Sequence, residues 1–107
     1  MINVLLNRNN GLTTGFTVKN HGATHVCSAV SMLVINTINS IASLTSLKDK
    51  EDFKCKYNEN GGFIEFSLII KTSRDKGAGL LLDAMVLGLT SVQEQHPNEI
   101  SIITKGE

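Results

Sequence analysis

Cys27 and His21 supply two of the parts that covalent acyl transfer requires, a thiol and a nearby imidazole. The thiolate is the nucleophilic form of cysteine, and the unpaired N–H groups and dipole at the start of a helix favour a negative charge there. A histidine a few residues upstream supplies a base for the thiol proton. We also expect the backbone N–H groups of Cys27 and Ser28 to hold an oxyanion. The opposing interpretation is a buried, unreactive Cys27, because unpaired cysteines are among the most buried side chains.

His25 competes with His21 for the role of base, because it is closer to Cys27 in the sequence. A histidine two residues before the cysteine more often directs its ring away, whereas Gly22 allows the connector after His21 to fold back. The two histidines and the cysteine are also competent zinc ligands. A structural zinc site usually needs four ligands in paired spacings, and this sequence has no second pair. We therefore expect no metal and no cofactor.

The elements that must position these side chains follow from turn residues and from the period of the apolar residues. Residues 2–6 and 13–19 have strand character on either side of the turn sequence Arg8-Asn9-Asn10-Gly11, which predicts an antiparallel hairpin. From Val26 to near Leu44, apolar residues recur every three or four positions, as in an amphipathic helix. The cysteine then lies in the first turn of this helix, and the histidine lies in the connector before it.

The second half of the chain repeats this order of elements. The pattern predicts a second hairpin, a second helix stopped by a His-Pro pair, and a closing strand, over residues 53–57, 64–70, 77–95 and 100–103. The order strand-strand-helix-strand-strand-helix-strand predicts an α+β two-layer sandwich with two helices packed on a five-stranded sheet. The length fits one domain over residues 1–107.

Two apolar patterns carry further expectations. Cys55 alternates with Phe53 and Tyr57 on a strand face that we expect to point inward, so a structural role is predicted for it. Leu80 and Leu87 widen the apolar stripe of the second helix. A homodimer surface on this stripe or on the second sheet face would explain the additional apolar residues, because a chain this short leaves much apolar surface uncovered. Ordinary core packing would explain it equally well.

Charge and hydropathy narrow the choice of partners. Lys plus Arg equal Asp plus Glu at 10 each, which argues against direct nucleic acid or membrane binding. The longest apolar run, Gly79 to Leu89, is interrupted by Asp83 and is shorter than the roughly 20 residues of a membrane span. Two cysteines and the absence of an apolar signal segment predict a reduced, cytoplasmic protein.

The stretch from His21 to Ile41 resembles the bacterial ribosomal-processing cysteine protease family. Its most specific part is the segment Val-Cys-x-x-x-Ser, which begins at Val26 and is followed by Asn39. The resemblance extends over nearly the whole chain through Asn60-Gly61-Gly62 and the run from Met85 to Ile102.

The resemblance implies a homodimeric cysteine endopeptidase, a hydrolase that removes an N-terminal extension from a large-subunit ribosomal protein. By position, Cys27 matches the nucleophile and His21 matches the base. We assign Ser31, Gly22 and Ser28 to substrate binding; Ser31 is one helical turn past the nucleophile. The alternative is a non-catalytic module of the same fold that binds a ribosomal protein or peptide, because the His–Cys connector is shorter than in the family.

Overall fold

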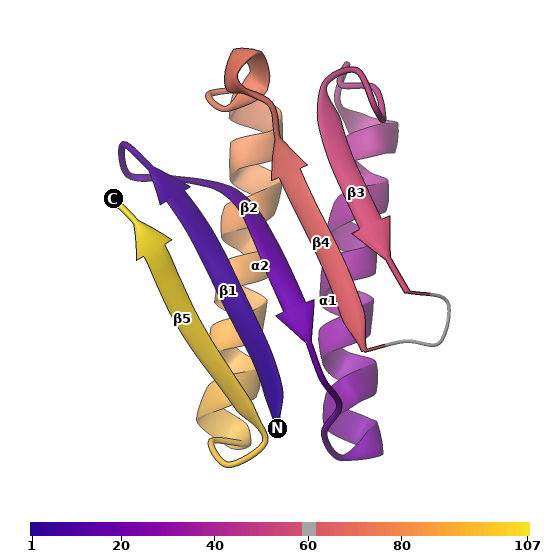
Figure 1. Cartoon of the computed structure of the whole chain (residues 1–107), viewed down its shortest axis with the longest axis vertical. Helices are drawn as coiled ribbons and strands as arrows, with labels where there is room; N and C mark the ends of the chain where they lie inside the picture. Colours follow the sequence, from indigo (N-terminus) through magenta and orange to yellow (C-terminus); the bar gives the residue numbers. More distant parts are fainter. Residues whose placement is uncertain (59–61) are drawn as a thin grey trace.

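A five-stranded sheet with both helices on one of its faces forms the molecule (Figure 1). The computed structural model describes residues 1–58 and 62–107. Its elements are β1 (Ile2–Asn9), β2 (Leu12–Lys19), α1 (Thr24–Leu44), β3 (Phe53–Tyr57), β4 (Phe63–Leu68), the short 3-10 helix η1 (Ile70–Thr72), α2 (Lys76–Gln95) and β5 (Ile100–Gly106). The predicted order and the α+β fold class are confirmed. Of the Asn60-Gly61-Gly62 motif, only Gly62 is among the described residues.

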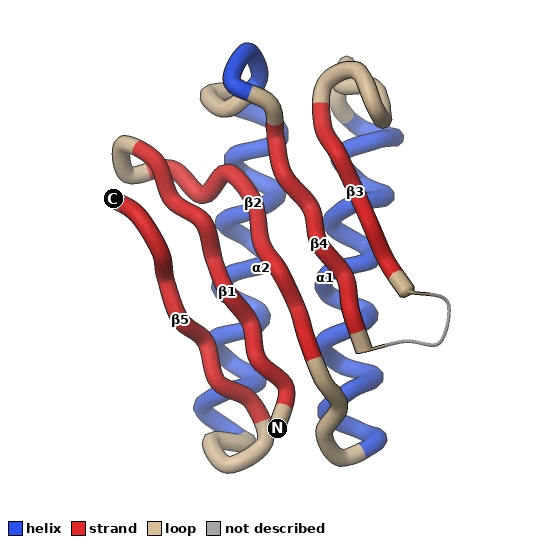
Figure 2. Tube along the Cα trace, viewed as in Figure 1, coloured by secondary structure: helices blue, strands red, loops and turns tan. Residues whose placement is uncertain are grey.

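The sheet has the strand order β3-β4-β2-β1-β5, and its strands run side by side in Figure 2. The β1–β2 and β3–β4 pairs are the two predicted hairpins, and β2 pairs antiparallel with β4. The turn between β1 and β2 contains Asn10 and Gly11 at φ values of 54° and 79°. Residues that tolerate positive φ are those that a two-residue hairpin turn requires. The closing strand β5 pairs parallel with β1, which makes the sheet mixed.

The core lies between the sheet and the helices. Phe66 on β4 stacks on Phe16 of β2 and packs against Phe53 of β3, with ring centroids 5.5 Å and 5.2 Å apart. Helix α1 is long and apolar enough to cross a membrane, judged by length and composition alone. The core helices of soluble proteins often meet the same two criteria. The buried side chains of α1 belong to the same core as these phenylalanines and come from Val26, Val30, Val34, Thr37 and Ile41.

Several local predictions were wrong. Helix α1 begins at Thr24, two residues before the predicted Val26. The stripe of α2 is narrower than expected, because Leu82, Met85 and Leu89 face the core whereas Leu80 and Leu87 are each 71% exposed. Tyr57 is also 70% exposed instead of inward-facing, since it ends the edge strand β3.

Candidate active site

The structure brings Cys27 and His21 together where β2 ends and α1 begins. The Sγ of Cys27 lies 3.9 Å from Nδ1 of His21. The cysteine is half-buried, whereas the histidine is exposed. Contacts between a nucleophile and its base are often long in unliganded enzymes and tighten when substrate binds. The connector after His21 therefore folds back far enough to pair these two side chains.

Gly62 lies close to Nε2 of the His21 ring, whereas Cys27 lies near Nδ1. A Cβ added to this glycine would lie 2.8 Å from Nε2 of His21, and its φ of +81° favours glycine. The N–H of Asn20 donates to the carbonyl oxygen of Gly62 at 2.9 Å, which ties the connector to the β3–β4 turn. Any side chain at this position would therefore displace the His21 ring. In the sequence Gly62 belongs to the Asn60-Gly61-Gly62 motif, and no local pattern there indicates this contact.

The backbone N–H groups predicted to hold an oxyanion are already used by the helix. Ala23 is the N-cap of α1, and the N–H of Cys27 donates to its carbonyl oxygen at 2.9 Å. Ser28 is one residue further into the helix, where each N–H bonds to the carbonyl four residues back. The prediction was wrong for Cys27 because the helix begins two residues earlier than its apolar pattern indicates.

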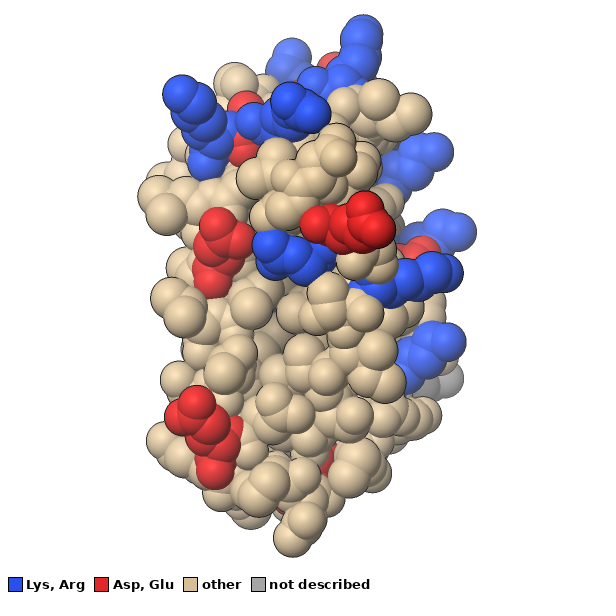
Figure 3. Space-filling model, turned by 90° about the vertical axis from the view of Figure 1, so that its left-hand side faces the viewer, with Lys and Arg blue, Asp and Glu red and all other residues tan. Residues whose placement is uncertain are grey.

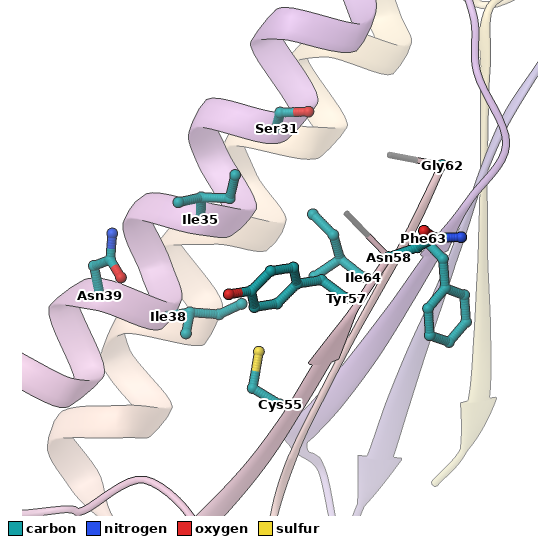
Figure 4. A pocket seen from close by; sticks show the side chains of 10 residues that line it. All are labelled: Ser31, Ile35, Ile38, Asn39, Cys55, Tyr57, Asn58, Gly62, Phe63 and Ile64. Atoms are coloured by element: carbon teal, nitrogen blue, oxygen red, sulfur yellow. The ribbon is translucent and has the colours of Figure 1, made fainter. Parts of the chain in front are cut away.

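Two adjacent cavities form a groove beside Cys27 and His21. The smaller, of about 110 Å³, is lined by both Cys27 and His21. The larger, of about 540 Å³, lies between α1 and the β3–β4 hairpin, with Cys55 on its floor (Figure 4). Both cavities share four lining residues, Ser31, Gly62, Phe63 and Ile64. A bound chain that passes the thiol would therefore continue along a largely apolar groove.

The remaining predicted residues have different positions relative to this groove. Ser31 lines both cavities. Ser28 is exposed and Gly22 packs against Glu99, and neither is among the residues that line the groove. The ring of His25 lies edge-on to His96, with centroids 5.1 Å apart. Within residues 1–58 and 62–107, no three His, Cys, Asp or Glu side chains are grouped as metal ligands would be.

The thiol of Cys55 has surroundings that oppose ionisation. Burial raises the pKa of the Cys55 thiol, and the negative charge of Asp49 raises it further. Because the thiolate is the reactive form, this pKa shift opposes nucleophilic reactivity of Cys55. The structural role predicted for it agrees with this environment.

Charge is unevenly distributed along the long axis on the face shown in Figure 3. In the view of Figure 3, Lys and Arg side chains gather toward the upper end, where η1 lies in Figure 1. The lower end shows acidic side chains and no basic ones in this view. Since α1 begins at the lower end, the paired thiol and imidazole lie away from the basic end of the molecule.

A thiol and an imidazole paired at a helix start, beside an apolar groove, are the parts of a cysteine hydrolase. The family profile for the cysteine protease Prp matches residues 1–101, and the chain belongs to this family. A search of curated proteins finds no match to the sequence.

Solved structures agree with this family in fold. The ribosomal processing protease Prp of S. aureus, with a covalently linked product peptide, is 26% identical with a TM-score of 0.87, covering 98% of this chain and 100% of that one. The same protease with a substrate peptide is 24% identical, with a TM-score of 0.82 and the same coverage. A Streptococcus mutans protein is 24% identical with a TM-score of 0.86, covering 100% of this chain and 96% of that one.

Proposed function

We propose that this protein is a cysteine endopeptidase that removes an N-terminal extension from a large-subunit ribosomal protein, with Cys27 as nucleophile and His21 as base. The observation that carries the proposal is the 3.9 Å approach of Nδ1 of His21 to Sγ of Cys27. Membership of the Prp family supports the assignment of this protein as a protease. The S. aureus relative is a ribosomal processing protease.

In the proposed mechanism, Nδ1 of His21 takes the thiol proton and Sγ of Cys27 attacks the scissile carbonyl carbon. The C–S bond forms while the carbonyl π electrons move to oxygen. Collapse of this intermediate breaks the C–N bond, and the imidazolium gives its proton to the leaving amine. His21 then deprotonates a water molecule that attacks the thioester, so that the acid is released and the thiol is restored.

The groove supports a peptide substrate with apolar side chains near the scissile bond. The cavity at the dyad is lined by the aliphatic side chains of Ile2, Val18 and Val30, and the larger cavity by Ile35 and Ile38. Burial of apolar side chains there contributes binding free energy of about 25 cal/mol per Å². We propose that the hydroxyl of Ser31, which lines both cavities, contacts the bound backbone.

Incubation with a peptide that spans the N-terminal extension of the organism's own ribosomal protein tests this proposal. We expect the wild-type protein to cleave the peptide, the Cys27→Ala variant to bind it without turnover, and mass spectrometry to identify a single cut. A scrambled peptide of the same composition is the matched control. Absence of cleavage by wild-type protein, with the peptide bound, would contradict the peptidase assignment.

A non-catalytic module that binds the same peptide is the second candidate. One observation favours it: the N–H of Cys27 bonds within α1, so the predicted oxyanion donor is occupied. This module predicts equal affinity for the peptide in wild type and Cys27→Ala, with turnover in neither. The same incubation therefore separates the two functions.

We further propose a cytoplasmic homodimer. Leu80 and Leu87, two helical turns apart on α2, are apolar and largely exposed, which fits a surface covered by a second copy. Light scattering is expected to give twice the 11.6 kDa of one chain. Leu87→Glu is expected to give the monomer mass if this face forms the contact.

A further inference from the structure

The start of helix α1 is fixed by a residue from the other end of the chain. Ala23 occupies the N-cap position, makes no side-chain capping bond, and is followed by no acidic residue in the first turn. A capping side chain normally fixes the point at which a chain enters a helix. Helix α1 therefore has no side-chain cap from its own first residues.

Glu99 supplies the missing contact from the turn before β5. Its Oε2 accepts a hydrogen bond from the N–H of Ala23 at 3.0 Å, across 76 positions in the sequence. In a capping box, a carboxylate from inside the helix reaches this same N–H. A carboxylate at a helix N-terminus also interacts favourably with the helix dipole. Glu99 therefore caps the N-terminus of α1, a role that a residue in the first turn of the helix usually has.

The same carboxylate also packs against the residue next to the base. A Cβ added to Gly22 would lie 3.2 Å from Oε2 and 3.3 Å from the carbonyl oxygen of Glu99. Glu99 thus contacts both Gly22 and Ala23, the two residues between His21 and the helix. A displacement of the carboxylate would be transmitted to the backbone that carries the imidazole.

The backbone of Glu99 is itself firmly held. Its carbonyl oxygen accepts from the N–H of Ile2 at 2.9 Å, and its N–H donates to the carbonyl of His96 at 3.0 Å. The ring of His96 packs edge-on against His25 in the first turn of α1. The turn before β5 is therefore attached to both β1 and α1, and Glu99 extends from a fixed position.

We propose that Glu99 is a positioning residue for the dyad, which holds the connector so that the His21 ring stays within reach of Cys27. This inference rests on the proposed peptidase function. Glu99 is not among the residues that line the groove, so it acts through the connector and touches no substrate. Loss of its carboxylate should therefore lower kcat and leave KM nearly unchanged, because misplacement of a reacting group by about 1 Å can cost about 100-fold in rate.

The test compares Glu99→Ala and Glu99→Gln with the exposed control Glu94→Ala in peptide cleavage. We expect Glu99→Ala to lose about 10- to 100-fold in kcat with KM within about threefold. Glu99→Gln retains an acceptor for the Ala23 N–H and should recover kcat to within about fivefold of wild type. Glu94→Ala should match wild type. Hydrogen exchange of the Ala23 amide should accelerate in Glu99→Ala at least about tenfold, which reports the contact without reference to activity.

Three results for Glu99→Ala would each overturn the proposal. They are an unchanged kcat per folded molecule, an increase confined to KM, and an unchanged exchange rate of the Ala23 amide. Should Glu99→Ala fail to fold, Gly22→Ala, which crowds the same carboxylate, must show the loss in kcat with KM unchanged. Failure of the proposed function looks different, because wild-type protein then cleaves nothing. In that case the Ala23 exchange rate and the alkylation rate of Cys27 still decide whether Glu99 fixes the connector.

Discussion

Cys27 and Cys55 are both half-buried and both line the same groove, but their sulfur atoms have different neighbours. The Cys27 sulfur has an imidazole nitrogen 3.9 Å away, at a helix start. Cys55 lies on an edge strand, where burial and the charge of Asp49 raise its pKa. Exposure therefore does not distinguish the proposed nucleophile Cys27 from Cys55. The groups next to each sulfur do.

The largest effect expected is the difference between the two alanine variants in peptide turnover. Cys27→Ala removes the proposed nucleophile and should lower kcat by about 10³-fold or more. Cys55→Ala removes a thiol that has no role in the proposed mechanism, so we expect kcat to stay within about threefold of wild type and any larger change to be in KM. Steady-state cleavage assays measure both. Equal losses in kcat would remove the distinction between the two cysteines.

The two histidines near Cys27 should differ almost as strongly. His21→Ala removes the proposed base and should lower kcat by about 10²- to 10⁴-fold. His25→Ala leaves His21 in place. Because the His25 ring lies against His96, we expect its removal to lower kcat by less than about tenfold. A greater loss in His25→Ala than in His21→Ala, measured at several pH values, would reverse the assignment.

A smaller effect is expected when the support of the imidazole is changed. Gly62→Ala places a methyl group 2.8 Å from Nε2 of His21 at a positive φ, so it should lower kcat about tenfold and stability by about 1 kcal/mol. Gly79→Ala is the control, because a Cβ there meets nothing within 4 Å in helix α2. Cleavage rates and thermal unfolding measure the two changes. If both variants behave alike, Gly62 does not hold the ring.

The smallest effect concerns the Cys55 thiol. Its raised pKa means that the folded state favours the protonated form, so alkylation in folded protein should require a higher pH than for a free thiol. By linkage, the associated stability is present below the pKa of the unfolded chain and is lost as pH rises through the folded value. Asp49→Asn removes the second cause and should increase the Cys55 alkylation rate about twofold at pH 8. An unchanged Cys55 alkylation rate would mean that burial alone raises the pKa of this thiol.

The sequence predicted those features that depend on neighbouring residues. The first hairpin follows from Asn10-Gly11, whose conformational freedom is a local property. The end of α2 follows from the His96-Pro97 pair, and the helix stops at Gln95 as expected. The pairing of Cys27 with His21 was also expected, because both residues lie on one short connector and the helix that follows it.

Features that depend on distant residues could not be predicted. The start of α1 was misplaced because Ala23 carries no capping side chain, and its N–H is satisfied by a carboxylate 76 positions away. The contact of Gly62 with the His21 ring also joins two segments far apart in the sequence, and no local pattern indicates it. The parallel pairing of β5 with β1 likewise depends on the packing of the whole sheet.

The most direct test of the central claim is the alkylation rate of Cys27 by iodoacetamide in a Cys55→Ala background, with and without His21. If His21 is the base for the thiol, as proposed, His21→Ala should slow alkylation at pH 7 at least about tenfold. His25→Ala, measured in parallel, should not slow it. An alkylation rate that is the same with and without His21 would contradict the dyad.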